Sequence, residues 1–95
     1  EEAMSHTAQT TLTIHHEAGL HARPAARFVK LAGTFPCTIT LRNLNKDAKA
    51  VNAKSMVSVL TQGVNQGTRI ELVATGEQAA EAIAALTKLI ESNFE

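Results

Sequence analysis

A histidine, an arginine and a proline stand close together in the segment GLHARPAARF, residues 19–28. The imidazole of His21 is of a kind that is largely neutral near pH 7 and can act as a nucleophile. Arg23 offers a planar guanidinium, which suits phosphate oxygens. Pro24 suits the first turn of a helix, whose free N–H groups and dipole favour an anion. Together these residues indicate an imidazole that could accept a phosphoryl group, whereas without this context His21 would be interpreted as an ordinary surface-loop histidine.

Histidines also commonly bind metal ions. His15 and His16 precede His21 by only a few residues, so a metal site is a second hypothesis. Adjacent residues of a strand point to opposite faces, so His15 and His16 cannot readily bind one ion. No cluster of acidic residues and cysteines supports them as ligands. We therefore expect no metal site and no cofactor, and we interpret both histidines as structural or solvated.

Length and charge limit the other function classes. The 95 residues are enough for one domain. The nine basic and nine acidic side chains cancel, which disfavours nucleic acid and anionic membranes as partners. No apolar run approaches the roughly 20 residues that span a bilayer, so no membrane insertion is expected. The single cysteine, Cys37, is expected to be a buried apolar residue, and it fits a reducing compartment such as the cytoplasm.

The first residues are polar and carry no periodic pattern. We expect residues 1–8 to form a disordered tail and residues 9–95 to form a single domain. Met4 is interpreted as the natural start, with residues 1–3 left over from expression.

Two periodicities alternate along the domain, and they define the elements that must position His21. Alternating apolar and polar residues predict strands over 10–16, 37–43, 48–52 and 68–75, and helical spacing predicts helices over 24–35, 53–63 and 75–94. Thr75 and Gln78 have the spacing of a capping box at the start of the last helix.

These elements predict an α+β fold in the order β-α-β-β-α-β-α. The strands alternate in polarity, which indicates a sheet exposed to water on one face and covered by helices on the other. We expect an open-faced β-sandwich: a four-stranded antiparallel sheet of order 1-4-2-3, covered on one face by three helices.

Two segments resemble one known family. GLHARPAA, residues 19–26, resembles the active-site signature of HPr, the histidine phosphocarrier family of the bacterial sugar phosphotransferase system. VNAKSMVSVL, residues 51–60, resembles the family's second signature, around a regulatory serine. The resemblance covers nearly everything after residue 9, and it implies the same order of elements and the same sheet order.

The resemblance implies roles for the first segment. His21 matches the phosphorylated histidine, which bonds phosphorus through Nδ1, and Arg23 and Pro24 match its active-site neighbours. The implied donor is enzyme I, phosphorylated by phosphoenolpyruvate, and the implied acceptors are the IIA domains of sugar permeases. The chain would then be a monomeric carrier and not a turnover enzyme on small molecules.

The second segment has a regulatory and a structural interpretation. Ser55 matches the serine that HPr kinase/phosphorylase modifies in species that have this enzyme. A serine at the start of a helix is equally natural as its N-cap, and one residue can do both.

A docking surface is implied beside that serine. The family's apolar docking patch matches Met56, Val57 and Leu60, whereas Val59 is expected in the core. The chain departs from the family pattern at Ser58, often a glycine there, and at Gln62, commonly an apolar residue.

Two other functions stay open from the sequence. One is a regulatory binding module that acts through Ser55 without transfer, although such relatives replace the histidine that this chain retains. The other is an enzyme that uses His21 as a general base, which lacks an evident partner acid and a deep pocket. Sugar uptake and nitrogen-linked regulation are both compatible with the segments.

Overall fold

The computed structural model describes residues 6–94. The elements are β1 (Thr7–Thr13), α1 (Ala22–Ala32), β2 (Thr38–Asn43), β3 (Val51–Asn52), α2 (Met56–Thr61), β4 (Arg69–Thr75) and α3 (Ala79–Glu91). Their order confirms the predicted β-α-β-β-α-β-α succession. None of the helices within this part of the chain is long and apolar enough to cross a membrane.

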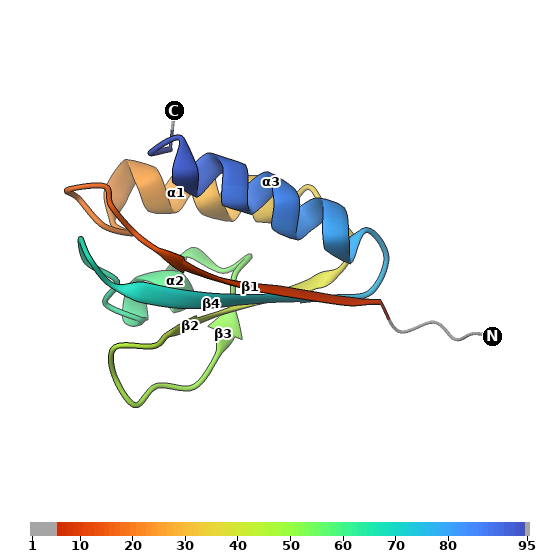
Figure 1. Cartoon of the computed structure of the whole chain (residues 1–95), viewed down its shortest axis with the longest axis horizontal. Coiled ribbons are helices and arrows are strands. Elements are labelled where there is room, and N and C mark those ends of the chain that lie inside the picture. Colours follow the sequence, from red (N-terminus) through yellow and green to blue (C-terminus); the bar gives the residue numbers. More distant parts are fainter. Residues whose placement is uncertain (1–5, 95) are drawn as a thin grey trace.

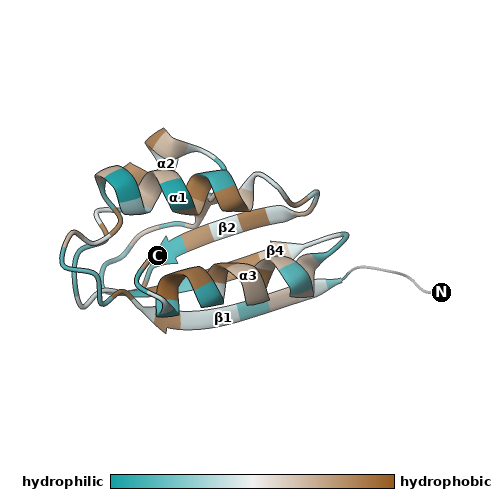
Figure 2. Cartoon of the chain, turned by 90° about the horizontal axis from the view of Figure 1, so that it is seen from above, coloured by the Kyte–Doolittle hydropathy of each residue, from teal (hydrophilic) through white to brown (hydrophobic). Residues whose placement is uncertain are grey.

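The sheet has the order β1-β4-β2-β3, and every neighbouring pair is antiparallel. Helices α1 and α3 lie side by side over one face of this sheet, and the other face is open (Figure 1). Helix α2 lies along the outer flank of α1, on the side away from α3 (Figure 2). The predicted open-faced sandwich with the sheet order 1-4-2-3 is therefore confirmed.

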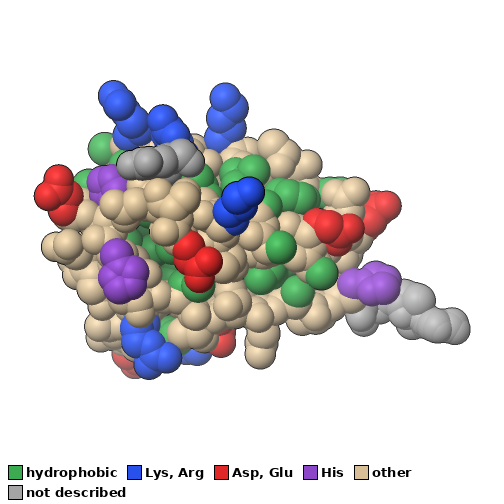
Figure 3. Space-filling model, turned by 45° about the horizontal axis from the view of Figure 1, so that its top comes forward, with side chains coloured by type: hydrophobic (Ala, Val, Ile, Leu, Met, Phe, Trp, Pro, Cys, Tyr) green, Lys and Arg blue, Asp and Glu red, His purple; other side chains and the backbone are tan. Residues whose placement is uncertain are grey.

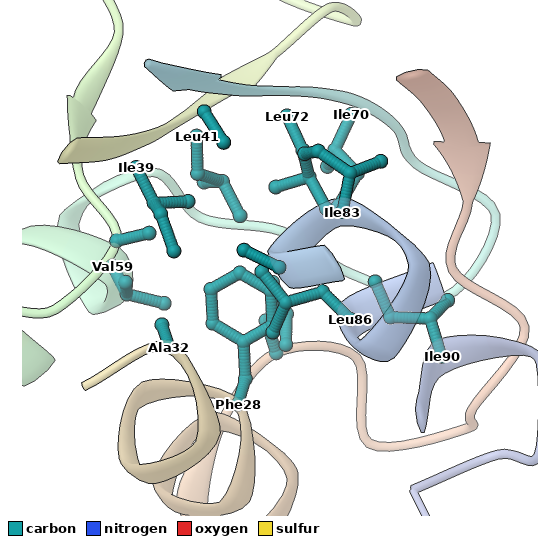
Figure 4. Packing of buried hydrophobic residues seen from close by; sticks show 14 of the residues in the cluster. Phe28, Ala32, Ile39, Leu41, Val59, Ile70, Leu72, Ile83, Leu86 and Ile90 are labelled. Atoms are coloured by element: carbon teal, nitrogen blue, oxygen red, sulfur yellow. The ribbon is translucent and has the colours of Figure 1, made fainter. Parts of the chain in front are cut away.

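The core lies between the sheet and the helices. Phe28 of α1 is fully buried and extends between α3 and the sheet, close to Leu86 (Figure 4). Strand β4 alternates as predicted, with Ile70 and Leu72 facing the helices. Burying a side chain such as Phe28 contributes about 1.5–3 kcal/mol, so α1 is held mainly by its apolar stripe.

Strand β1 differs from its predicted boundaries at both ends. It begins at Thr7, and Thr7 and Ala8, which were assigned to a tail, pair with Thr75 and Ala74 of β4. The prediction was wrong there because tertiary pairing, and not local polarity, decides where this strand begins. Residues 1–5 of the predicted tail lie outside the described residues.

The predicted capping box at the start of α3 is wrong. Thr75 is the last residue of β4 and pairs with both Thr7 and Thr38, so its backbone is extended within two ladders. The chain turns at Gly76, whose φ of 120° favours glycine. Helix α3 then begins at Ala79, and the preceding Gln78 makes no side-chain capping bond.

Two side chains that the sequence singled out lie in the interior. Cys37 is buried, which confirms its interpretation as a small apolar residue. Gln62 is also buried, and its Oε1 accepts a hydrogen bond from the Asn43 N–H at 2.8 Å. Its Nε2 donates to the Lys49 carbonyl at 3.2 Å. The departure from an apolar residue is therefore tolerated because both polar ends of the amide are satisfied.

Candidate functional site

His21 is the N-cap residue of α1, with φ −128° and ψ 160°. Its side chain makes no capping hydrogen bond. Within residues 6–94, no acceptor is found for the backbone N–H groups of Ala22 and Arg23 at the first turn. Ala22 has a φ of 49°, which is uncommon for a residue other than glycine. The helix start thus presents unpaired N–H groups beside an imidazole that is not used as a cap.

A close contact between two loops fixes the position of this helix start. Gly19 has a φ of 62°, and a Cβ there would collide with the Val64 carbonyl oxygen and lie 2.7 Å from the Asn65 Cα. The N–H of the buried Leu20 donates to the same Val64 carbonyl at 2.9 Å. The chain entering α1 therefore rests directly on the chain entering β4.

The imidazole of His21 reaches across this contact. Its Nε2 lies 3.1 Å from Oδ1 of Asn65, which is 44 residues further along the chain. Asn65 was not identified from the sequence, and its one local signal is the Asn-Gln-Gly turn composition of residues 65–67. Nothing in that turn signal points to His21.

A hollow of about 390 Å³ opens beside the start of α1. Arg23 and Pro24, the two predicted neighbours of His21, both line it, and Arg27 from the next turn adds a second guanidinium. The other lining residues are His16, Ala18, Ala22, Asn93 and Phe94, so the described lining contains no acidic side chain. Lys and Arg side chains project at several places along the upper margin of the view in Figure 3. The hollow therefore suits an anionic group.

The chain after α3 closes one side of the hollow. Phe94 is 4% exposed, and its ring meets that of His16 edge-on, with centroids 5.8 Å apart. Arg27 Nη1 donates to the Phe94 carbonyl at 3.0 Å. His16 is thus a structural part of the wall, and its Nδ1 accepts a hydrogen bond from the Ala18 N–H at 3.0 Å. This wall was not foreseen, because it joins residues far apart in sequence.

Ser55 lies at the start of the neighbouring helix, α2. It is the N-cap residue, and its Oγ accepts a hydrogen bond from the Ser58 N–H at 3.3 Å. The structural interpretation of Ser55 is therefore confirmed, and its modification stays a prediction.

The predicted docking residues of α2 differ in exposure. Val57 is 73% exposed and Leu60 is 38% exposed, whereas Met56 is half-buried. Val59 is fully buried, as expected. The apolar surface that α2 offers therefore consists mainly of Val57 and Leu60, on a helix that packs against α1.

No group of three or more His, Cys, Asp or Glu side chains in the described part of the chain is arranged to hold an ion.

The comparisons with known proteins agree on one family. The model of the PTS HPr component phosphorylation site matches residues 8–92. The chain belongs to the HPr family. The phosphocarrier protein HPr of Pseudomonas putida is 39% identical over 84 residues, which cover 88% of this chain and 91% of that protein.

A solved HPr structure gives the same fold. The crystal structure of HPr-C-His from Thermoanaerobacter tengcongensis has a TM-score of 0.86 and 46% sequence identity, and it covers 92% of this chain and 94% of that one. Membership of the HPr family supports a role as a phosphocarrier of the phosphotransferase system.

A longer relative is also similar. The multiphosphoryl transfer protein of Haemophilus influenzae is 45% identical over 80 residues. Those residues are 84% of this chain but 16% of that protein, so the chain spans about one sixth of its length. The HPr fold therefore also occurs as one part of a larger protein.

Proposed function

We propose that His21 carries the phosphoryl group, which it accepts on Nδ1 from phosphorylated enzyme I and passes to the IIA domains of sugar permeases. The observation that carries the proposal is that His21 occupies the N-cap of α1 without capping it. Its half-buried ring is therefore available at a helix start with unpaired N–H groups, next to a hollow that Arg23 lines.

The transfer step follows from this geometry. The Nδ1 lone pair forms a bond to phosphorus while the donor's own bond to phosphorus breaks, with its electron pair staying on the donor. In the transition state the charge spreads over three equatorial oxygens. The Arg23 guanidinium and the N–H groups at the start of α1 stabilise that charge. Release to the acceptor is the same step in reverse, with the Nδ1–P bond breaking.

The proposed role is that of a carrier and not of a turnover enzyme. The phosphoryl group itself is the cargo, so the reaction needs no resident cofactor. Partner proteins dock through Val57, Leu60 and the exposed part of Met56, close to α1. We place this exchange in the cytoplasm, with the chain acting as a monomer.

Labelling tests the proposal directly. The protein is incubated with enzyme I and phosphoenolpyruvate, and the product is examined by ³¹P NMR and by digestion to the labelled peptide. We expect an acid-labile phosphoramidate on Nδ1 of His21. A label on another residue, or an acid-stable ester, would falsify the assignment.

We propose further that Ser55 is a regulatory site for HPr kinase/phosphorylase. A phosphate there brings a charge of roughly −1.5 to −2 next to Val57, and an apolar contact with a partner must then desolvate it. At the N-terminus of α2 the same charge is favourable, so the fold persists. The expected result is weaker docking on an intact protein.

Two substitutions separate this charge effect from capping. Ser55→Asp keeps a capping side chain and adds one negative charge, whereas Ser55→Ala removes the cap and adds none. We expect enzyme I to phosphorylate His21 more slowly in Ser55→Asp than in Ser55→Ala, with circular dichroism confirming that both fold. Equal rates would leave Ser55 as a helix cap only.

A further inference from the structure

The side chain of Asn65 contacts the His21 ring. In the described part of the chain its one hydrogen bond is that between Oδ1 and the imidazole Nε2, at 3.1 Å. We propose that Asn65 is a positioning residue for phosphoryl transfer, which holds the imidazole proton on Nε2 and so leaves the Nδ1 lone pair for phosphorus. The proposal rests on the proposed role of His21 and deepens it.

The tautomer follows from the chemistry of the two atoms. A neutral imidazole has one N–H donor and one acceptor nitrogen. The amide oxygen of Asn65 can only accept, so Nε2 must carry the hydrogen in this contact. The hydrogen bond that one ring nitrogen makes sets which of the two nitrogens is protonated. Here the bond from Nε2 to Asn65 leaves Nδ1 as the nucleophile. Within residues 6–94, no partner competes for His21 Nδ1.

The backbone of Asn65 is held in place by Thr68. The Asn65 N–H donates to Thr68 Oγ1 at 3.1 Å, and the Asn65 carbonyl accepts from the Thr68 N–H at 3.1 Å. The preceding Val64 carbonyl accepts from Leu20, the residue before His21. The loops that enter α1 and β4 lie at the same end of the molecule (Figure 1). The two partners are thus positioned before any donor arrives, which lowers the entropy lost in reaching the reactive geometry.

The same contact serves both directions of transfer. When the Nδ1–P bond forms and the donor's bond breaks, Nε2 keeps its proton and the ring gains positive charge. The carbonyl dipole of Asn65 stabilises that charge. When the phosphoryl group leaves, the electron pair returns to Nδ1 and the ring departs as the neutral Nε2–H tautomer. No proton has to move in either step.

The test is ¹⁵N NMR of the His21 ring in the free protein, without enzyme I. In the wild type we expect Nε2 to be protonated and Nδ1 to be unprotonated. Asn65→Leu removes the acceptor at similar volume and should shift the tautomer ratio several-fold towards Nδ1–H. Asn65→Asp restores an acceptor opposite Nε2 and, at a pH where the ring is neutral, should return the tautomer ratio to Nε2–H. Gln66→Leu is the matched control, because it removes a hydrogen bond from the same loop to the His15 carbonyl.

Transfer kinetics complete the test. We expect Asn65→Leu to slow phosphorylation of His21 by roughly three- to tenfold, which corresponds to about 0.6–1.4 kcal/mol in the activation free energy. Gln66→Leu should transfer at the wild-type rate. Asn65→Ala replaces Asn65→Leu if the larger side chain disturbs folding in circular dichroism.

The outcomes separate this inference from the proposed function. An unchanged tautomer in Asn65→Leu overturns the role of Asn65, whatever the transfer rate. A slower transfer without a tautomer change assigns Asn65 a structural role and also overturns the inference. Failure of the wild type to carry label on His21 overturns the proposed function, whereas the wild-type ring spectrum tests the Asn65 contact independently.

Discussion

Helices α1 and α2 begin in the same backbone conformation but use it differently. The N-cap residues His21 and Ser55 both have extended dihedral angles, with φ of −128° and −109°. The hydroxyl of Ser55 turns back onto its own helix and accepts from the Ser58 N–H. The imidazole of His21 turns away from its helix and contacts Asn65.

The difference shows how a helix start becomes a site. A side-chain cap satisfies an N–H group and contributes about 0.5–2 kcal/mol, but it also occupies the place where an anion would bind. Helix α1 does without that contribution because buried side chains such as Phe28 hold it against the sheet. Its first N–H groups therefore stay available for phosphate oxygens.

The largest expected effect comes from replacing the ring itself. His21→Ala and His21→Ser should both lose all acid-labile label from enzyme I. In urea unfolding, the free energy of unfolding of His21→Ser should also exceed that of His21→Ala by about 1 kcal/mol, because serine caps a helix. The control His15→Ala alters an exposed histidine and should retain full label. Equal stabilities of the two variants would contradict the statement that α1, unlike α2, lacks a side-chain cap.

The next effect concerns the loop contact that replaces a side-chain cap at α1. Gly19→Ala places a Cβ against Val64 and Asn65 at a positive φ, so we expect a loss of about 3 kcal/mol in the free energy of unfolding. Gly67→Ala is the matched control, because its φ is also positive, at 88°, but nothing lies within 4 Å of the added Cβ. It should cost about 1 kcal/mol. Urea unfolding measures both, and equal losses would contradict the role of the loop contact.

Arg23 should affect transfer without affecting folding. Arg23→Ala removes a charged donor from the hollow, and we expect phosphorylation by enzyme I to slow roughly tenfold or more. The free energy of unfolding should change by less than about 0.5 kcal/mol, because Arg23 is exposed. Lys30→Ala, at an exposed position in the last turn of α1, is the control for general charge loss. A large loss of stability with normal transfer would reverse the assignment.

The smallest effect belongs to the cap of α2. Ser55→Ala should lower the free energy of unfolding by about 1 kcal/mol. Ser58→Ala leaves the N–H that Ser55 binds in place, so we expect a change within about 0.5 kcal/mol. Thermal unfolding followed by circular dichroism distinguishes the two. A neutral Ser55→Ala would remove the contrast between α1 and α2.

The element order was predictable because it depends on local periodicity, and the sheet order was predictable from antiparallel pairing together with the family resemblance. The start of β1 at Thr7 and the extended backbone of Thr75 were not, since pairing across the sheet decides both. His21 and Arg23 were evident from one short segment. Asn65 was not, because its contact with His21 joins positions 44 residues apart and leaves no periodic trace.

The hydrogen bond from Arg27 to the Phe94 carbonyl holds the chain after α3 beside the hollow, which bears on where the protein is best attached to a surface or a label. Phe94 lines the hollow, so a dye, a surface linker or a fused domain attached after it starts at the rim of the site. His6 lies at the opposite end of β1, where its carbonyl accepts from the Gly76 N–H (Figure 1). Attachment ahead of His6 therefore keeps the approach to His21 clear, and immobilised biosensors built on this chain are best anchored from that end.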